Sequence, residues 1–269
     1  MIRKTIFSGR PRAAPSRRSA LRGALASVGG LALAGCDRLS NNAAFVDVLK
    51  SAQQLSHGAQ RLVAGRKAMA QEFTQADVAA HFRANGTLVP ADADYQTLMR
   101  GHFAAWKLQV DGLVEKPAAF TLAELRAMPS RTQITRHDCV EGWSTIGKWK
   151  GVQLSHVLAQ VKPLPNAKYV VFRCADSMDD PSANADSRYY ESVDLDDAYH
   201  AQTVLAYELN DQPLPVSNGA PLRVRIERQL GYKHAKYLMR LELVERFDQI
   251  RDGQGGYWED NGYEWYAGI

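Results

Sequence analysis

Hydrophobic and polar positions divide the chain into a helical N-terminal part and a mixed C-terminal part. Between residues 43 and 85 the apolar side chains recur at helical spacing, and Thr74 is placed to cap a second helix that ends near Gly86. Residues 87–105 show no such period, so an irregular stretch is expected there. The apolar positions of the first helix are Phe45, Val48, Leu49, Ala52, Leu55, Ala59, Leu62 and Val63.

From residue 106 onward, short strand patterns interleave irregularly with short helix patterns. Thr121 and Glu124 form a capping box that opens a short helix ending at Pro129, and the stretch from Leu154 to Val161 is amphipathic. This order favours an α+β domain with a mixed sheet over regular βαβ repeats. The predicted strands cover residues 106–114, 132–135, 169–173, 203–209, 222–226 and 236–244.

The positive charge of the chain is concentrated before residue 36. The sequence has 33 Lys and Arg against 29 Asp and Glu, a formal net charge of +4. Seven of the basic residues and no acidic residue precede position 36, which leaves 26 basic against 29 acidic residues in the remainder. The remainder is slightly acidic, so a general nucleic-acid surface is not expected.

Residues 1–35 have the layout of an export signal. A basic stretch with the pair Arg17 and Arg18 precedes the apolar run 23–34, which is 12 residues long where about 20 are needed to span a bilayer. The arginine pair and its neighbours resemble a twin-arginine export signal. Leu-Ala-Gly before Cys36 resembles the lipobox of bacterial lipoproteins, in which this cysteine is lipidated. We therefore expect a periplasmic protein held at the inner membrane by a lipid anchor.

The mature chain suits one large domain or one domain with an appendage, at an ordinary domain size of about 150 residues. We expect residues 1–35 to be the signal peptide with its lipobox, 36–89 a helical spacer or appendage, and 90–269 the functional domain. The twin-arginine route carries folded proteins and is used heavily for those that receive a cofactor before export. A cofactor in the functional domain is therefore expected.

Cys139 carries the sharpest chemical hypothesis. It lies in RHDCVEGW, residues 136–143, between a predicted strand and a loop that contains glycine. The adjacent Arg136 and His137 are expected to favour its thiolate, the form that binds a metal or attacks an electrophile. No Cys-x-x-Cys or paired-histidine spacing supplies further zinc ligands, so a metal here would need a cofactor to complete its coordination. A disulfide with Cys174 is the simpler alternative in an exported protein.

Several motifs together resemble the sulfite oxidase family of molybdopterin enzymes, particularly its periplasmic branch with the methionine sulfoxide reductase catalytic subunit. RHDCVEGWS, followed by Trp149-x-Gly151 and Leu154, is similar to the cysteine loop of that family. The resemblance covers about residues 90–269 and implies a mixed-sheet molybdopterin-binding domain of sulfite oxidase type. The other motifs are LMRGH (98–102), FRCAD (172–176), NGAPLRV (218–224), GYKHAK (231–236) and the C-terminal stretch 255–269.

The resemblance implies Mo-molybdopterin as the cofactor and a set of residues around it. Cys139 would bind molybdenum beside two sulfurs of the pterin, as suits a soft thiolate. Glu141 would relay protons, and Arg100 would bind an oxyanion substrate. Arg223 and Lys236 would hold the cofactor's phosphate. Apart from Cys139, the implied cofactor-binding residues are His102, Cys174, Asp176, Asn218, Arg223, His234, Ala235 and Lys236.

The implied reaction is a two-electron oxygen-atom transfer on a small oxo compound, such as a sulfoxide or sulfite. Sulfite-oxidising relatives carry an arginine shortly after the cysteine, where this chain has Gly142, Trp143 and Ser144, so a sulfoxide is favoured while Arg100 keeps sulfite open. The sequence contains no haem-binding Cys-x-x-Cys-His motif, so the electron partner is expected to be an external cytochrome. A dimerisation domain that commonly follows this domain has no counterpart here, and a monomer is expected.

Two other functions remain open on the residues alone. Cys139 would be the nucleophile of a transferase or hydrolase if a histidine such as His137 activated it. Alternatively, the chain would be a metal-free, lipid-anchored binding protein.

Overall fold

The chain divides after Ser56 into two units, of which the larger, His57–Ile269, contains the sheets. The computed structural model describes residues 42, 45, 48, 51, 55, 57–62, 65, 67–178 and 187–269. The expected signal peptide and Cys36 lie outside the described residues. Within the described ranges, no helix has both the length and the apolar character needed to cross a bilayer.

The first predicted helix is present in part, and the second is wrong. Residues 57–62 are helical, and so are the described positions 45, 48, 51 and 55. Thr74 forms a capping box, but it opens only the single 3-10 turn η1 (Gln75–Asp77). The backbone on both sides of this turn hydrogen-bonds to strands instead: the Phe73 amide donates to Ile134 O (2.8 Å) and the Ala79 amide to Ile146 O (3.0 Å).

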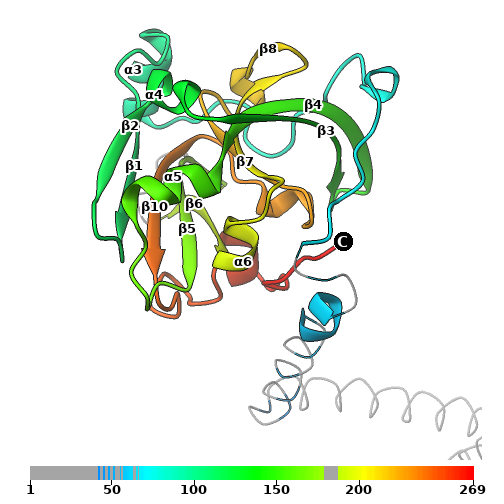
Figure 1. Ribbon diagram of the computed structural model, residues 1–269, viewed down its shortest axis with the longest axis vertical. Coiled ribbons are helices and arrows are strands. Elements are labelled where there is room, and N and C mark those ends of the chain that lie inside the picture. Colours follow the sequence, from blue (N-terminus) through cyan, green and yellow to red (C-terminus); the bar gives the residue numbers. More distant parts are fainter. Residues whose placement is uncertain are drawn as a thin grey trace, which may run out of the picture. The chain divides into compact units, whose positions relative to one another are not determined.

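Two sheets form the frame of the larger unit (Figure 1). The first has the strand order β2-β1-β10-β5-β6; β1 and β10 run parallel and the other neighbours antiparallel. The second, antiparallel throughout, has the order β3-β4-β7-β8, with β9 paired to β7. The predicted α+β class with a mixed sheet is confirmed. The strands are β1 (Lys107–Gly112), β2 (Ala118–Thr121), β3 (Ser130–Cys139), β4 (Trp143–Gln153), β5 (Tyr169–Ser177), β6 (Arg188–Asp194), β7 (Thr203–Leu209), β8 (Gln212–Pro213), β9 (Arg223–Ile226) and β10 (Leu238–Val244).

The two helices predicted from local signals are confirmed. Thr121 accepts a hydrogen bond from the Glu124 amide (3.2 Å) and starts α4 (Leu122–Ala127). Helix α5 (Leu154–Val161) buries its apolar positions in a core cluster that includes residues of both sheets. Burying each such side chain contributes about 1.5–3 kcal/mol, so α5 helps to hold the two sheets together.

Several elements have no counterpart in the sequence-based prediction, among them helix α3 and strand β4. Helix α3 (Ala93–Arg100) occupies the stretch expected to be irregular, where Asp92 accepts a hydrogen bond from the Tyr95 amide (2.8 Å) and caps it. Strand β4 contains glycines that read as loop residues. They serve close packing, because a Cβ at Gly151 would lie 2.2 Å from Leu205 O on the neighbouring strand β7.

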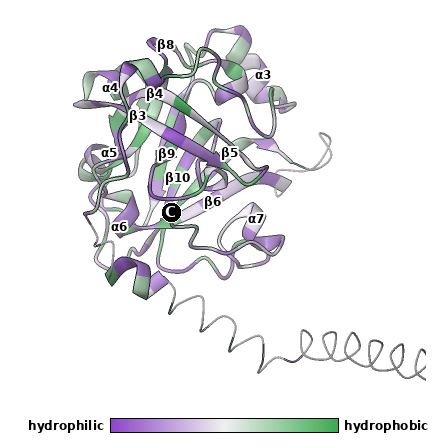
Figure 2. Cartoon of the chain, turned by 90° about the vertical axis from the view of Figure 1, so that its right-hand side faces the viewer, coloured by the Kyte–Doolittle hydropathy of each residue, from purple (hydrophilic) through white to green (hydrophobic). Residues whose placement is uncertain are grey.

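Figure 2 shows that the short helices α6 (Leu195–Ala198) and α7 (Tyr257–Asp260) are largely hydrophilic. Their polar residues are nevertheless partly interior. Asp197 of α6 and Glu259 of α7 are both buried, at 1% and 2% exposure. The hydrophilic character of α6 and α7 therefore does not mean that these helices lie wholly on the surface. Each buried carboxylate needs a partner inside the protein.

Candidate functional site

One pocket, of about 80 Å³, gathers most of the predicted site residues. Segments far apart in the chain form it: the end of the β3–β4 hairpin, the end of β5, the 231–236 segment and α7. The predicted residues in its lining are Cys139, Glu141, Asp176, His234, Ala235 and Lys236, and the other lining residues include Asn85, Thr87, Met178, Tyr189 and Trp258.

Cys139 ends β3 and borders the pocket at a tight turn. The Gly142 amide donates to Cys139 O (3.0 Å), and the φ of Gly142 is +83°, a value that favours glycine. Burial raises the pKa of the Cys139 thiol. Arg136 does not counter this, because its exposed guanidinium pairs with Asp138. The expected support of the thiolate by Arg136 is wrong, because the cation whose charge acts to lower the pKa of Cys139 is Arg83.

His137 is fully buried and neutral. Its Nδ1 accepts a hydrogen bond from Arg225 (2.9 Å), because a guanidinium can only donate. Burial, followed by the charge of Arg225, holds the pKa of His137 well below its ordinary value. The proton of the neutral ring is then on Nε2, which leaves no free basic nitrogen. His137 therefore supports neither the Cys139 thiolate nor the activation of Cys139 as a nucleophile.

Two buried cations, Arg223 and Lys236, pack against each other beside the pocket. Arg223 is fully buried and donates to the backbone oxygens of Asn218 and His234, at 3.1 Å each. Burial lowers its pKa to about 9. Gly219, with φ +112°, permits this packing, because a Cβ there would lie 2.9 Å from Lys236 Cβ and 3.2 Å from Arg223 Cβ.

Among the described residues, Lys236 donates hydrogen bonds only to uncharged partners. Its ammonium donates to the backbone oxygens of Asn85 (2.6 Å), Thr87 (2.5 Å) and Ser217 (2.9 Å). Burial, followed by the nearby charge of Arg223, lowers its pKa to about 7. Among the described residues no carboxylate forms a salt bridge with either cation, so an anion bound here would relieve an unfavourable arrangement.

Several buried polar atoms around these cations have no hydrogen-bond partner in the described part of the chain. They are Asp176 Oδ1, Asn218 Nδ2, Arg223 Nε and His234 Nδ1. Asp176 is 3% exposed, and burial raises its pKa to about 6. His234 donates through Nε2 to Ile226 O (2.9 Å), so its Nδ1 is the accepting nitrogen. Each unpaired buried group costs about 1–3 kcal/mol, which indicates that a bound polar molecule completes the site.

These residues fit a molybdopterin with a terminal phosphate. Lys236 and Arg223 supply the positive charge that a phosphate needs. Asp176, Asn218 and His234 supply acceptors and donors for a polar ring system. In the ranges that the structure describes, no group of three or more His, Cys, Asp or Glu side chains could hold a metal by itself. A metal at Cys139 would therefore take its remaining ligands from the cofactor.

Arg100 and His102 are not brought into this pocket. Arg100 is exposed at the end of α3 and donates to Thr97 Oγ1 (3.0 Å). His102 is exposed just beyond the helix. Both lie on the solvent side of the segment, whose buried side chain is Tyr95.

Cys174 is buried on β5 and lines a separate groove. Cys139 and Cys174 are both free. The disulfide alternative is therefore wrong. Burial raises the pKa of Cys174 well above its ordinary value, so this thiol is neutral and serves packing.

Residues 85–87 form a wall of the pocket for which the sequence offered no signal. The oxygens of Asn85 and Thr87 bind Lys236, which lies 151 and 149 residues further along the chain. Asn85 Oδ1 is buried without a partner among the described residues. The hypothesis that the stretch up to residue 85 is only a spacer misses this contact, because it depends on a distant residue.

Two buried ion clusters were also missed. Arg225 pairs with Glu227 at 2.6 Å, with both side chains fully buried. Lys233 lies between Glu191 and Glu259, also fully buried, with 2.5 Å to the Glu259 carboxylate. The sequence offered one signal for these clusters, namely charged residues in or near the largely apolar stretches NGAPLRV and GYKHAK, since buried charges require partners.

Comparison with known proteins gives a match over most of the larger unit. The sequence model of the family described as "Oxidoreductase molybdopterin binding domain" matches residues 95–250. A protein of Azospira oryzae named "Putative protein-methionine-sulfoxide reductase subunit YedZ1" is 43% identical over 165 residues, covering 61% of this chain and 56% of that protein. "Protein-methionine-sulfoxide reductase catalytic subunit MsrP" of Ralstonia nicotianae is 35% identical over 166 residues, covering 60% and 50%.

The chain thus spans about half the length of the curated relatives it matches. Among solved structures, the sulfane dehydrogenase SoxCD from Paracoccus pantotrophus aligns with a TM-score of 0.47 and 23% identity, over 52% of this chain and 38% of that chain. The residues of the family match include Cys139, Asp176 and Lys236, while the pocket walls at residues 85–87 and at Trp258 lie outside it.

Proposed function

Because the chain belongs to the family of oxidoreductase molybdopterin binding domains, we propose that it reduces a sulfoxide by two-electron oxygen-atom transfer. Membership in this family confirms the predicted enzyme class, its sulfite oxidase resemblance and Mo-molybdopterin as the cofactor. The sulfoxide substrate is proposed from two similar proteins that are named as protein-methionine-sulfoxide reductases.

The observation that carries this proposal is one pocket that contains a free thiol and the buried cation Lys236, with the buried Arg223 beside it. Neither cation forms a salt bridge with a described carboxylate. When bound, the cofactor supplies the redox chemistry. Cys139 would supply the protein ligand to the metal, and Lys236 and Arg223 would hold the phosphate. Asp176 and His234 would fix the orientation of the pterin through their unpaired atoms.

Reduction of a sulfoxide consumes two electrons and two protons and releases water. Glu141 borders the pocket with a half-exposed carboxylate, whose Oε2 accepts a hydrogen bond from Trp143 Nε1 (2.8 Å). This bond holds the carboxyl in place between solvent and pocket. Glu141 would deliver protons from solvent to the substrate oxygen.

The described lining of the pocket favours a neutral substrate over sulfite. Lys236 is its only cationic side chain, and this cation is committed to the cofactor's phosphate. Val140, Met178 and Trp258 add apolar surface, which suits a thioether-like sulfoxide. Sulfite, a dianion, would need additional cations at the metal, and Arg100 lies elsewhere.

Export, anchoring and electron supply extend the proposal. The protein would leave the cytoplasm by the twin-arginine route, be held at the inner membrane through Cys36, and receive single electrons from an external cytochrome. The support is the order of Arg17, Arg18, the apolar run 23–34 and Cys36 in the sequence. The domain boundaries and the monomeric state stay predictions.

Metal analysis combined with a paired assay tests the function. Protein purified from a molybdopterin-producing host should contain about one molybdenum per chain and should reduce methionine sulfoxide with reduced methyl viologen faster than it oxidises sulfite. Absence of molybdenum would reject the proposed function and favour the alternative of a metal-free binding protein. Molybdenum with sulfite as the faster substrate would keep the cofactor and reject the sulfoxide.

Cys139→Ser isolates the metal ligand. We expect sulfoxide reduction to fall by at least about 10³-fold, because the protein's contribution to metal coordination is lost, while the free energy of unfolding changes little at this partly exposed turn. Ser144→Ala, in the same hairpin, is the control and should keep most of the activity. Retained turnover in Cys139→Ser would refute the ligand assignment.

A further inference from the structure

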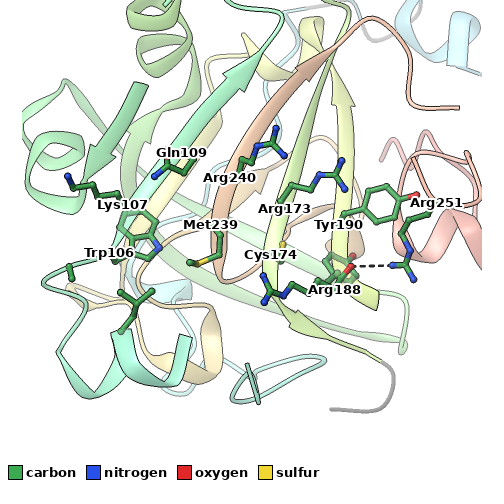
Figure 3. Close-up of a pocket in the computed structure, with 13 residues that line it drawn as sticks. Trp106, Lys107, Gln109, Arg173, Cys174, Arg188, Tyr190, Met239, Arg240 and Arg251 are labelled. Carbon is green, nitrogen blue, oxygen red and sulfur yellow. Dashed lines mark hydrogen bonds between the residues drawn. The ribbon is translucent and has the colours of Figure 1, made fainter. Parts of the chain in front are cut away.

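A second concavity, of about 680 Å³, lies on the mixed sheet (Figure 3). We call it the basic groove. Its cationic side chains come from four neighbouring strands and from the loop after β10, and none of the described residues that line it is acidic. They are Lys107 on β1, Arg240 on β10, Arg173 on β5, Arg188 on β6, and Arg251 in the loop.

Rim carboxylates balance three of these charges and leave two. Arg173 pairs with Glu242 (2.6 Å) and Arg240 with Asp111 (2.8 Å); Arg188 pairs with Asp92. Neither Lys107 nor Arg251 has an ion pair with any described residue, and both are exposed. Arg251 instead donates to Arg188 O (3.2 Å) and lies over the ring of Tyr190 (5.6 Å to the centroid). The described lining of the groove therefore has net positive charge, and two of its cationic side chains are available to bind an anion.

The basic groove and the cofactor pocket share a wall. Tyr189 lines both, and on β5 Cys174 lines the groove while Asp176, two residues further, lines the pocket. Tyr189 is buried, and its hydroxyl donates to Tyr232 O (2.6 Å), which fixes the ring in this wall. A molecule in the groove would thus be separated from the pocket by little more than one side chain.

We propose that the basic groove is the docking site of the single-electron carrier, and that this carrier presents an acidic protrusion to it. The inference rests on the proposed function, which requires two electrons to arrive one at a time. The cations spread over four strands, about 14 Å across at the usual strand spacing, which is wider than one phosphate and suits several carboxylates. Of the two cations without an ion pair, Arg251 can bind a carboxylate bidentately and Lys107 can bind one as a point charge. A planar membrane surface does not enter a concave site.

In the resulting reaction the carrier is oxidised and the substrate reduced. Two reduced carriers each give up one electron in turn, and two protons enter from solvent. The sulfur–oxygen bond of the sulfoxide breaks, and the oxygen leaves as water.

The test uses the full chain and the double variant Lys107→Gln/Arg251→Gln, with Lys116→Gln/Arg246→Gln as a control of equal charge whose exposed residues lie outside the groove. Calorimetry at low salt measures binding of an acidic c-type cytochrome, with a basic c-type cytochrome as the matched probe. We expect the groove variant to raise the Kd for the acidic cytochrome about tenfold, the lower end of electrostatic effects on association. The control pair should leave it unchanged, and the basic cytochrome should not bind.

Turnover separates this proposal from the proposed function. With reduced acidic cytochrome as donor, kcat/KM for sulfoxide reduction should fall about tenfold in the groove variant, while turnover with methyl viologen stays the same. Equal Kd values in wild type and groove variant would overturn the docking site. Groove-dependent binding of tripolyphosphate, or of vesicles with anionic lipid, without cytochrome binding would also overturn it. If the wild type does not reduce the sulfoxide with reduced methyl viologen, the proposed function itself is rejected.

Discussion

Lys233 and Lys236 lie three residues apart and are both buried, but their surroundings are opposite. Lys233 is held between the carboxylates of Glu191 and Glu259. Burial acts to lower its pKa, yet the two carboxylates outweigh burial and raise it. Among the described residues, Lys236 donates hydrogen bonds only to backbone oxygens. Burial and the charge of Arg223 lower its pKa to about 7, although the carboxyl of Asp176 acts in the opposite direction.

This difference distinguishes a buried lysine that stabilises the fold from a buried lysine that binds a ligand. A buried charge that the protein balances itself holds segments together, here the 231–236 segment, β6 and α7. A buried charge that the protein leaves unbalanced costs stability unless a ligand supplies the opposite charge. By this criterion Lys233 is a structural residue and Lys236 a cofactor-binding residue, although they belong to one short motif.

Lys233→Met should have the largest effect on stability. It leaves two buried carboxyls facing each other without a cation, and breaking such a cluster typically costs about 3–5 kcal/mol. Urea unfolding of the cofactor-free protein measures the free energy of unfolding. A loss below about 1 kcal/mol would show that Lys233 is not the structural cation of this comparison.

Lys236→Met should reverse the pattern. Molybdenum and pterin content should fall at least about tenfold, because a charge-assisted hydrogen bond of about 1.5–3 kcal/mol is lost. The free energy of unfolding of the cofactor-free protein should fall by less than half the loss in Lys233→Met, because an unfavourable buried charge disappears together with three hydrogen bonds. Lys116→Met, at an exposed lysine, is the control for cofactor content. Normal cofactor content in Lys236→Met would contradict its assignment.

The free energy of unfolding should depend on pH through the titration of Lys236. Its folded pKa, about 7, lies below the unfolded value of 10.5, so between these values the unfolded chain binds the extra proton and stability rises with pH. One such proton corresponds to about 1 kcal/mol per pH unit. The cofactor-free wild type should therefore be more stable at pH 8.5 than at pH 7.5, and Lys236→Met should lose this slope. The raised pKa of Asp176, to about 6, acts in the opposite direction but between pH 3.8 and 6.

An identical slope in wild type and Lys236→Met would place the responsible group elsewhere. Holoenzyme provides the second control. A bound phosphate stabilises the ammonium form, so the slope should shrink when the cofactor is present.

Glu259→Gln should have the smallest effect, within about 1 kcal/mol. The substitution leaves one carboxylate for one ammonium and preserves a side chain that accepts a hydrogen bond. Burial and the neighbouring Glu259 raise the pKa of Glu191 well above its ordinary value, so one of the two acids already tends to hold a proton. Urea unfolding alongside Lys233→Met makes the comparison. A loss as large as that of Lys233→Met would mean that both carboxylates are required in ionised form.

Local signals in the sequence predicted local structure well. The capping box of Thr121 and Glu124 and the apolar face of Leu154–Val161 specify helices through neighbours within four residues. Strand β4 was missed because Gly147 and Gly151 look like loop residues, whereas each provides room for a side chain or backbone across the sheet.

The site was predictable where motif and chemistry coincide. Cys139, Asp176 and Lys236 come together in one pocket as expected. Arg100 does not, because a short Arg-x-His pattern carries no information on which side of a helix end faces the interior. Asn85 could not be found, since its place depends on Lys236. Glu191 and Glu259 could not be found for the same reason. Glutamate is usually a surface residue, and the burial of these two depends on tertiary contacts that the sequence does not show.

The walls of the cofactor pocket also determine when the pocket can exist during synthesis. Residues 85–87 are held by the ammonium of Lys236, and Trp258, which lies more than a hundred residues beyond Cys139, closes another side. A nascent chain synthesised only as far as Cys139 has the thiol, but it lacks Arg223, Lys236 and Trp258. Loading of the cofactor therefore has to follow synthesis of the chain through Trp258, and a variant truncated before Trp258 should be made but not loaded.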